Sequence, residues 1–302
     1  MTGAPAQALA VAFAIMGTLC YAVAAVTQQT SAAKLPSTKA FDPAVLLRLA
    51  RTRRWLLGFG AVLCAYALQV VALDLGRLVV VEPVLPIGLL FALVLAARVE
   101  GRRLRSGEWT AALAAVAGLA VFLVVAEPTG GYRTAATGPL ALAVAGAVGI
   151  AAVCSLISAR VAAAHRALIL GIGGGIGAGV TDAMTKTVAA LAGSEHFGVF
   201  GDVRLYLLAV VGLCTFTMQQ NAFRAAGLSA SLPSFAVLEP ITGAMLGLAL
   251  YSERLDGGGL RIAVEVIAVL AALWGIARLA NSVIAELARL AAVATPPADP
   301  AA

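Results

Sequence analysis

Apolar stretches of roughly 20 residues recur along the whole chain, and short connections between them hold most of the polar side chains. An α-helix needs this length to cross the hydrocarbon core of a bilayer, whereas a strand of a membrane barrel needs about ten residues. None of the stretches alternates cleanly between apolar and polar positions. The pattern therefore predicts an all-α, polytopic membrane helix bundle with about nine spans. The predicted spans are residues 8–28, 55–73, 78–98, 109–126, 138–158, 167–191, 204–221, 229–250 and 262–280.

Two segments outside the spans also carry helical signals. Residues 41–54 begin with Asp42 and Pro43, which suit an N-cap and a first helical position, and continue with leucines and arginines. We expect a short cytoplasmic helix there, which either lies on the membrane surface or leads into the second span as a solvated segment. Residues 281–293 repeat apolar positions at helical spacing and predict another surface helix within a cytoplasmic tail, residues 281–302.

The composition agrees with a membrane protein. Hydrophobic residues make up 61% of the 302 residues and charged residues 12%, with a mean hydropathy of +0.97. Soluble domains carry about 25% charged residues, so this chain has too few to cover a soluble surface. The four cysteines lie singly inside predicted spans, which favours small packing residues over a disulfide framework or a zinc site.

Basic residues are divided unequally between the two sides of the predicted bundle. Of the 21 Lys and Arg residues, 15 lie in the loops after spans 1, 3, 5 and 7 or in the C-terminal tail, and five lie on the other side. Because basic residues accumulate on the cytoplasmic side, this count predicts an external N-terminus and a cytoplasmic C-terminus. The chain is thus expected to be a multi-pass protein of the inner (plasma) membrane, and its net charge of +6 does not imply a nucleic-acid partner.

A weak internal repeat relates the two halves of the chain. Residues 69–104 and 220–255, aligned without gaps, share a few identities, among them Gln69 with Gln220 and Arg103 with Arg254. Span 3 runs inward and span 8 outward in the predicted topology, so matching them gives an inverted repeat, as in many transporters. We predict one membrane domain, residues 1–280, with repeats at about 8–126 and 167–280 and the span 138–158 as their linker.

Charged side chains inside apolar spans are candidates for a functional site, because each costs about 2.5–3.5 kcal/mol to insert. Glu82, Asp182, Lys186 and Glu239 are the candidates for substrate binding or coupling, whereas Glu265 is interpreted as interfacial. Asp182 and Lys186 are four residues apart on one helix face, where an ion pair would neutralise both charges. That pair is either a static lock between helices or part of a site for a substrate or a proton.

Proline directly follows two of these carboxylates, as Glu82-Pro83 and Glu239-Pro240. A proline inside a helix removes one backbone hydrogen bond and frees a carbonyl group near the carboxylate for a cation or a polar solute. Glu82 lies near the outer interface, where water alone explains it, whereas Glu239 lies near the membrane centre. Amides near span ends form a secondary polar set, with ordinary solvation of helix ends as the simpler interpretation: Gln28, Gln29, Gln219, Gln220 and Asn221.

The glycine-rich run from Gly171 to Gly179 is not a phosphate-binding loop, because no strand precedes it and the required GK[ST] is absent. Its glycines repeat at four-residue steps, which predicts close packing of this span on its neighbours. The two histidines, His165 and His196, lie in loops on opposite sides, and neither HExxH nor GxSxG occurs. We therefore expect neither catalysis nor a cofactor nor a bound metal.

Residues 53–109 and 219–255 resemble the two halves of the drug/metabolite transporter superfamily, in its bacterial EamA-like branch. The shared features are a small-residue connection, a V-x-P or L-E-P step and a glycine-rich span that ends in an E-R-L-like element. The resemblance covers about residues 8–280. That family usually has ten spans with both termini inside; nine spans and an external N-terminus are more similar to the NIPA-type magnesium-transporter branch. The resemblance implies alternating access between inverted halves around a polar cavity, without a cofactor, and with Glu239 as a candidate for proton coupling.

The function predicted from the sequence is a secondary transporter that moves a small metabolite or drug-like solute across the inner membrane by alternating access. The alternatives are a metal-ion carrier of the NIPA type, a flippase for a lipid-linked precursor and a non-transporting membrane scaffold. The expected partners are a small molecule or ion and membrane lipid, and a homodimer is compatible with this hypothesis. A transporter predicts a cavity lined by Glu239, Asp182 and Lys186, whereas a scaffold predicts these side chains sealed in tight pairs.

Overall fold

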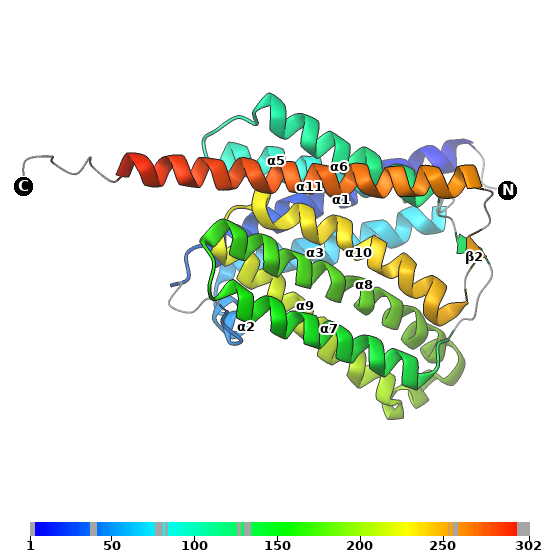
Figure 1. Ribbon diagram of the computed structural model, residues 1–302. Coiled ribbons are helices and arrows are strands. Elements are labelled where there is room, and N and C mark those ends of the chain that lie inside the picture. Colours follow the sequence, from blue (N-terminus) through cyan, green and yellow to red (C-terminus); the bar gives the residue numbers. More distant parts are fainter. Residues whose placement is uncertain are drawn as a thin grey trace, which may run out of the picture.

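The computed structural model describes residues 4–36, 41–75, 81, 84–125, 128–129, 134–252, 254–255 and 259–294. These residues form a polytopic bundle of membrane helices, as the apolar pattern predicts (Figure 1). Its α-helices are α1 (Ala4–Ala32), α2 (Val45–Leu49), α3 (Arg53–Leu75), α5 (Ile87–Val99), α6 (Ser106–Val125), α7 (Thr137–Ser158), α8 (Ala163–Glu195), α9 (Val203–Ala225), α10 (Leu228–Tyr251) and α11 (Gly259–Ala294). A 3-10 helix, His196–Gly201, joins α8 to α9.

Eight of these helices are long and apolar enough to cross a membrane: α1, α3 and α6 to α11. The predicted third span, residues 78–98, corresponds to the shorter helix α5. Its 13 residues extend over about 20 Å, less than the roughly 30 Å of a hydrocarbon core. The start of α1 and the end of α11 lie at opposite ends of the bundle (Figure 1). The chain therefore passes between the two ends an odd number of times, as nine passes require.

The two helices expected outside the spans differ from the prediction. The first, α2, is confined to Val45–Leu49, and Asp42 is not its N-cap, which is Ala44. The second does not exist as a separate element, because α11 continues without a break to Ala294. No glycine or proline interrupts residues 281–294, so nothing in the sequence ends the helix at the membrane surface. α11 is about 54 Å long and extends beyond the other helices (Figure 1).

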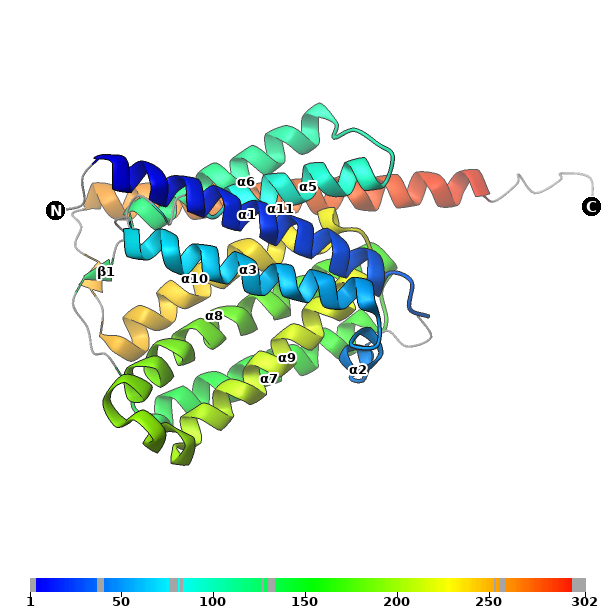
Figure 2. The ribbon, with the colours of Figure 1, turned by 180° about the vertical axis from the view of Figure 1, so that it is seen from behind.

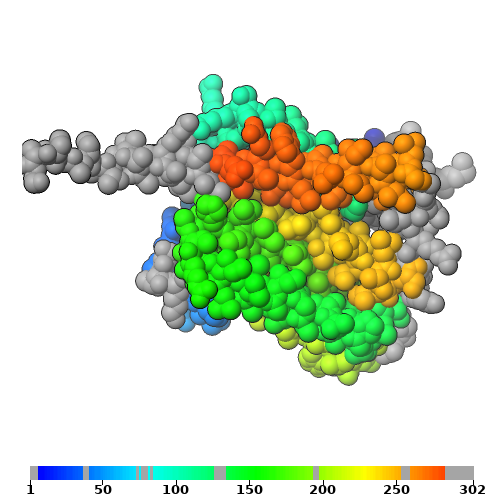
Figure 3. Space-filling model, in the orientation of Figure 1, coloured from blue at the N-terminus to red at the C-terminus, as the bar shows by residue number. Residues whose placement is uncertain are grey.

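The outer surface of the bundle is apolar. Large hydrophobic side chains point outward from the long helices other than the central helix α8, such as Leu57 on α3, Leu142 and Leu156 on α7 and Ile267 on α11, each at least 65% exposed. Figure 3 shows one face of the bundle, to which α7, α10 and α11 contribute. In water this surface would cost free energy, whereas in a bilayer it contacts lipid chains. The protein is therefore a multi-pass membrane protein.

Glycines on α8 let three neighbouring helices approach it closely, as their four-residue spacing predicts. A Cβ atom at Gly175 would lie 2.9 Å from the carbonyl oxygen of Phe235 on α10, and one at Gly179 would lie 2.5 Å from that of Glu239. On another side of the helix, a Cβ atom at Gly173 would lie 2.6 Å from Met218 on α9 and 3.1 Å from Cys154 on α7. α8 is thus the central helix of its half, and Gly179 fixes the distance to the part of α10 that carries Glu239.

The helices α6 and α11 pack against each other through a reciprocal pair of glycines. A Cβ atom at Gly118 would lie 2.5 Å from the carbonyl oxygen of Ala268, and one at Gly275 would lie 2.5 Å from that of Ala111. α6 and α11 are the last spans of the two predicted repeats, so a symmetric contact between them is what an inverted repeat requires. The repeat itself remains a prediction from the sequence.

The first predicted repeat contains α1, α3, α5 and α6, and the second contains α8 to α11. These two groups of helices approach each other differently at the two ends of the bundle. α3 and α9 lie close together near α2 and separate toward the end where the N-terminal helix begins (Figure 2). Near α2 the rings of Phe59 and Phe216 are 6.2 Å apart. At the other end, strands β1 (Pro128–Thr129) and β2 (Arg254–Leu255) form a short antiparallel pair that connects the segments after α6 and α10.

The start of α9 is capped by Asp202, outside the membrane-spanning helices. Its carboxylate accepts a hydrogen bond of 2.8 Å from the backbone N–H of Arg204 and further bonds from the guanidinium of the same residue. These bonds hold the pKa of the Asp202 carboxyl at about 2. The cap is therefore ionised at neutral pH, and its contribution to stability is lost only as the pH falls from about 4 toward 2.

Candidate functional site

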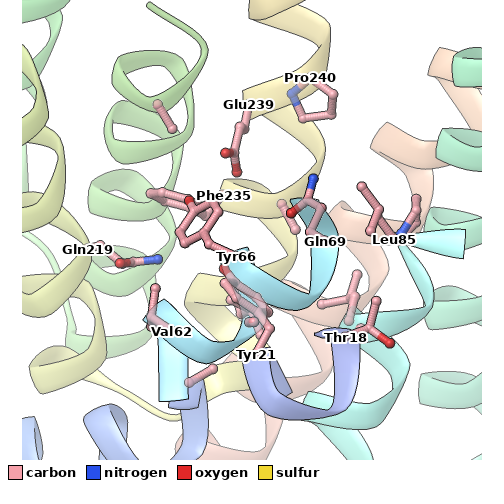
Figure 4. A pocket seen from close by; sticks show the side chains of 18 of the residues that line it. Thr18, Tyr21, Val62, Tyr66, Gln69, Leu85, Gln219, Phe235, Glu239 and Pro240 are labelled. Carbon is pink, nitrogen blue, oxygen red and sulfur yellow. The ribbon is translucent and has the colours of Figure 1, made fainter. Parts of the chain in front are cut away.

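A cavity of about 660 Å³ lies among α1, α3, α5, α6, α8, α9 and α10 (Figure 4). Ligand sites for small molecules occupy about 300–1,000 Å³ and combine apolar walls with a few polar groups. The walls of this cavity are mostly apolar and aromatic, and both predicted halves contribute to them. The cavity is therefore the candidate site for a solute.

Glu239 brings a carboxylate into this cavity from α10. Its side chain points into the space on the side of Tyr66 and Phe235 (Figure 4). The next residue, Pro240, lies inside α10 and has no N–H, so the carbonyl of Ala236 has no donor four residues later. Glu239, Pro240 and Ala236 all line the cavity, which places the carboxylate and the carbonyl that lacks its usual donor on one stretch of helix.

Asp182 supplies a second carboxylate from α8. It also lines the cavity and is close enough to Glu239 for the two groups to interact electrostatically. Within the described part of the chain, neither carboxylate takes part in a hydrogen bond or an ion pair. Asp182 is exposed to solvent and Glu239 is half-buried, as expected for side chains that face a water-accessible cavity.

The ion pair predicted between Asp182 and Lys186 is not formed. Lys186 Nζ instead lies over the ring of Tyr251, 4.5 Å from its centre, and Lys186 does not line the cavity. Tyr251 is held in place because its hydroxyl contacts Thr187 Oγ1 at 2.7 Å and donates to the carbonyl oxygen of Ala183. One helical turn separates Lys186 from Asp182, and its flexible side chain reaches the electron-rich face of the ring instead.

Several lining residues carry chemistry that the sequence pattern did not single out. Tyr21 on α1 and Tyr66 on α3 are close enough to Glu239 for an electrostatic interaction. Gln69 also extends into the space (Figure 4). Phenylalanines complete the wall: Phe59, Phe216, Phe223 and Phe235. One signal was available, because tyrosines in spans usually lie at the interfaces, and these two lie well inside theirs.

The amides of the secondary polar set separate into two groups. Gln28 and Gln219 line the cavity. Gln220 is fully buried at its edge, where it accepts a hydrogen bond of 3.0 Å from Trp55 Nε1 and donates one of 2.7 Å to Gln28 Oε1. These bonds connect α1, α3 and α9 at the end near α2, so Gln220 belongs to a structural contact between helices.

Asn221 has a similar structural role. Its side-chain Oδ1 accepts a hydrogen bond of 2.8 Å from the backbone N–H of Asp42, and its Nδ2 donates one of 3.0 Å to the Asp42 carbonyl. The buried carboxylate of Asp42 pairs with Arg48 at 3.1 Å and with Arg224 at 3.6 Å. This cluster anchors the segment before α2 to the end of α9, and the Asp42 carboxylate also accepts a hydrogen bond of 3.0 Å from the backbone N–H of Ala44.

A second polar cluster joins the two groups of helices at the same end. Arg102, in the connection between α5 and α6, pairs with the buried Glu108 at 3.0 Å. Its guanidinium also donates a hydrogen bond of 3.2 Å to Ser229 Oγ at the start of α10. Together with the contacts of Gln220 and Asp42, this cluster closes the bundle near α2.

The remaining candidates have no assigned place in the cavity. Glu82 lies outside the described residues. Gln29, on α1, is half-buried and does not line the cavity. Glu265, on α11, is buried and is likewise absent from the lining. The cavity thus brings together Glu239, Asp182, Gln28 and Gln219.

The fold and the cavity define a polytopic helical membrane protein with a central acidic cavity. An uncharacterized protein of Corynebacterium glutamicum is 32% identical to the chain over 256 residues, which cover 82% of this chain and 86% of that protein. The chain belongs to the same family as this protein. No family model matches the sequence. No solved structure matches the chain.

Proposed function

We propose that the chain is a secondary transporter of the drug/metabolite type, and not an enzyme, that moves a small solute across the inner membrane by alternating access. The observation that carries this proposal is the cavity between the two groups of helices, which holds two carboxylates without a partner in the described chain. Ionisable groups inside a membrane protein mark solute and proton pathways, because unused charges there are costly.

The alternatives receive less support from the same cavity. A scaffold predicts sealed pairs, yet Asp182 and Glu239 face open space. A flippase for a lipid-linked precursor predicts a basic residue beside the cavity, and none of the lining residues in the described part of the chain is Lys, Arg or His. A carrier for Mg²⁺ predicts a hydrated, oxygen-rich site, whereas most of this wall is apolar or aromatic.

The sides of the membrane follow from the distribution of basic residues. We propose that the N-terminus lies outside, which places α2 and the connection between α5 and α6 in the cytoplasm. The contacts of Gln220, Asp42 and Arg102 then close the cytoplasmic side, and the divergence of α3 and α9 faces outward (Figure 2). Transport requires a second state in which the cytoplasmic contacts open.

The test is solute-dependent proton movement in proteoliposomes. Purified protein is reconstituted with the pH-sensitive dye pyranine inside, a pH gradient is imposed, and cationic, zwitterionic, neutral and anionic organic solutes are added in turn, with Mg²⁺ as a separate arm. We expect at least one organic solute to cause a proton flux that protein-free liposomes do not show. If Mg²⁺ alone causes such a flux, the metal-ion carrier replaces our proposal; if no compound does, proton-coupled transport is refuted.

A further inference from the structure

The charges that the described residues bring to the cavity have one sign. Asp182 and Glu239 line it, and the described lining contains no Lys, Arg or His. The cation nearest along α8, Lys186, is held at the ring of Tyr251 outside the lining. Charges interact more strongly across a protein interior than across water, so a site of this kind favours a positive solute and repels a negative one.

The aromatic side chains add a second preference. Tyr66 and Phe235 lie near the Glu239 carboxylate, and Tyr21 lies beyond Tyr66 in the same cavity (Figure 4). The faces of aromatic rings attract organic cations, and their bodies provide apolar contact area. Small hydrated ions gain little from such a wall, because Mg²⁺ keeps several of its water ligands when it binds.

The size of the cavity and its composition lead to one class of solute. We infer that the cavity binds an organic cation with an apolar or aromatic body, which places its charge at Glu239 and Asp182 and its body against Tyr21, Tyr66 and Phe235. This inference rests on the proposed function and specifies its solute class. A cavity of about 660 Å³ accommodates a molecule with one or two rings, together with water.

The carboxylates that bind the cation also bind protons, so the cation and the proton can exchange at the same site. Among the described residues, the titratable groups that line the cavity are Glu239 from α10, Asp182 from α8, Tyr21 from α1 and Tyr66 from α3. The helices α5, α6 and α9 contribute no titratable group to this described lining. A proton on Glu239 removes the negative charge that a bound cation needs. Cation and proton therefore compete for the site, so cation affinity falls as the pH is lowered.

The test measures binding directly, in detergent and without transport. Radiolabelled 1-methyl-4-phenylpyridinium is the cationic probe, and unlabelled neutral 4-phenylpyridine N-oxide and anionic biphenyl-4-carboxylate, which have nearly the same shape, compete against it. We expect saturable binding of the cation at pH 8, at least ten-fold weaker competition by the neutral compound and none by the anion. Equal competition by the neutral compound or the anion, or no saturable cation binding, overturns the inference.

Two variants locate the site. Glu239→Gln is expected to weaken cation binding at least ten-fold and to flatten its pH dependence, whereas Glu265→Gln, a buried glutamate outside the cavity, leaves both unchanged. Asp182→Asn serves as the second cavity variant, and size-exclusion profiles verify that each variant is folded. Undiminished binding by folded Glu239→Gln and Asp182→Asn proteins overturns the inference. Transport of a neutral or anionic solute would contradict only the solute class, whereas cation binding without any transport would contradict only the proposed function.

Discussion

Glu239→Gln is expected to reduce solute-dependent proton flux in proteoliposomes at least ten-fold. The substitution preserves the size of the side chain but removes its charge and its ability to take up a proton. Glu239 extends into the cavity and is the one acidic residue of α10, so no other carboxylate on this helix can replace it. A ten-fold loss corresponds to about 1.4 kcal/mol, which is a modest value for the loss of one charge–charge interaction in a protein cavity.

Glu265→Gln is the matched control for this substitution. Glu265 lies on the membrane-spanning helix α11, is buried and does not line the cavity. The same change of side chain there should leave the flux within about two-fold of the wild-type value, since it touches no part of the solute path. A similar loss in both variants would show that the effect comes from changing a carboxylate in the bundle and not from the cavity.

Gly179→Ala is expected to lower the stability of the protein by about 1–3 kcal/mol, the range for overpacking a tight contact. The added Cβ atom would lie 2.5 Å from the carbonyl oxygen of Glu239 and 2.8 Å from the backbone nitrogen of Gly243. Backbone atoms cannot rotate away as a side chain can, so α8 and α10 must separate. The measurement is thermal unfolding in detergent, in which we expect the transition to shift down by several degrees.

Gly149→Ala provides the comparison for Gly179→Ala. Gly149 lies in the middle of α7, and a Cβ atom there would meet nothing within 4 Å. Alanine stabilises a helix relative to glycine by roughly 0.5–1 kcal/mol, so this variant should unfold at the same temperature or slightly higher. A destabilisation of equal size in both variants would mean that close packing on α10 is not what requires glycine at position 179.

The helices could be predicted from the sequence because one physical constraint dominates in a membrane. A backbone in lipid must satisfy its hydrogen bonds internally, so each long apolar stretch becomes a helix whatever its neighbours are. The close packing of α8 could also be predicted from the sequence, since the spacing of its glycines places Gly171, Gly175 and Gly179 on one face. The end of α11 was mispredicted because its amphipathic continuation was taken for a new element, although no helix-breaking residue precedes it.

The cavity could be predicted only in part. Glu239 and Asp182 were found because each is a charge within an apolar stretch, which needs no knowledge of the partner helix. The contact of Lys186 with Tyr251 could not be predicted from the sequence. Tyr251 lies 65 residues further along the chain, and only the packing of α8 against α10 brings the two side chains together. Gln220 and Asn221 look like cavity residues in the sequence, but their hydrogen bonds to Trp55 and Asp42 depend on the tertiary arrangement.

The most direct test of the proposed transporter is the direction of uptake when the pH gradient is reversed. Proteoliposomes containing the wild-type protein receive radiolabelled 1-methyl-4-phenylpyridinium under gradients of equal size and opposite sign, with the membrane potential clamped. Exchange of the cation against protons through the carboxylates of the cavity predicts accumulation when the inside is acidic and depletion when it is alkaline. Uptake that does not depend on the sign of the gradient, or that equals the uptake of protein-free liposomes, would contradict proton-coupled transport by this protein.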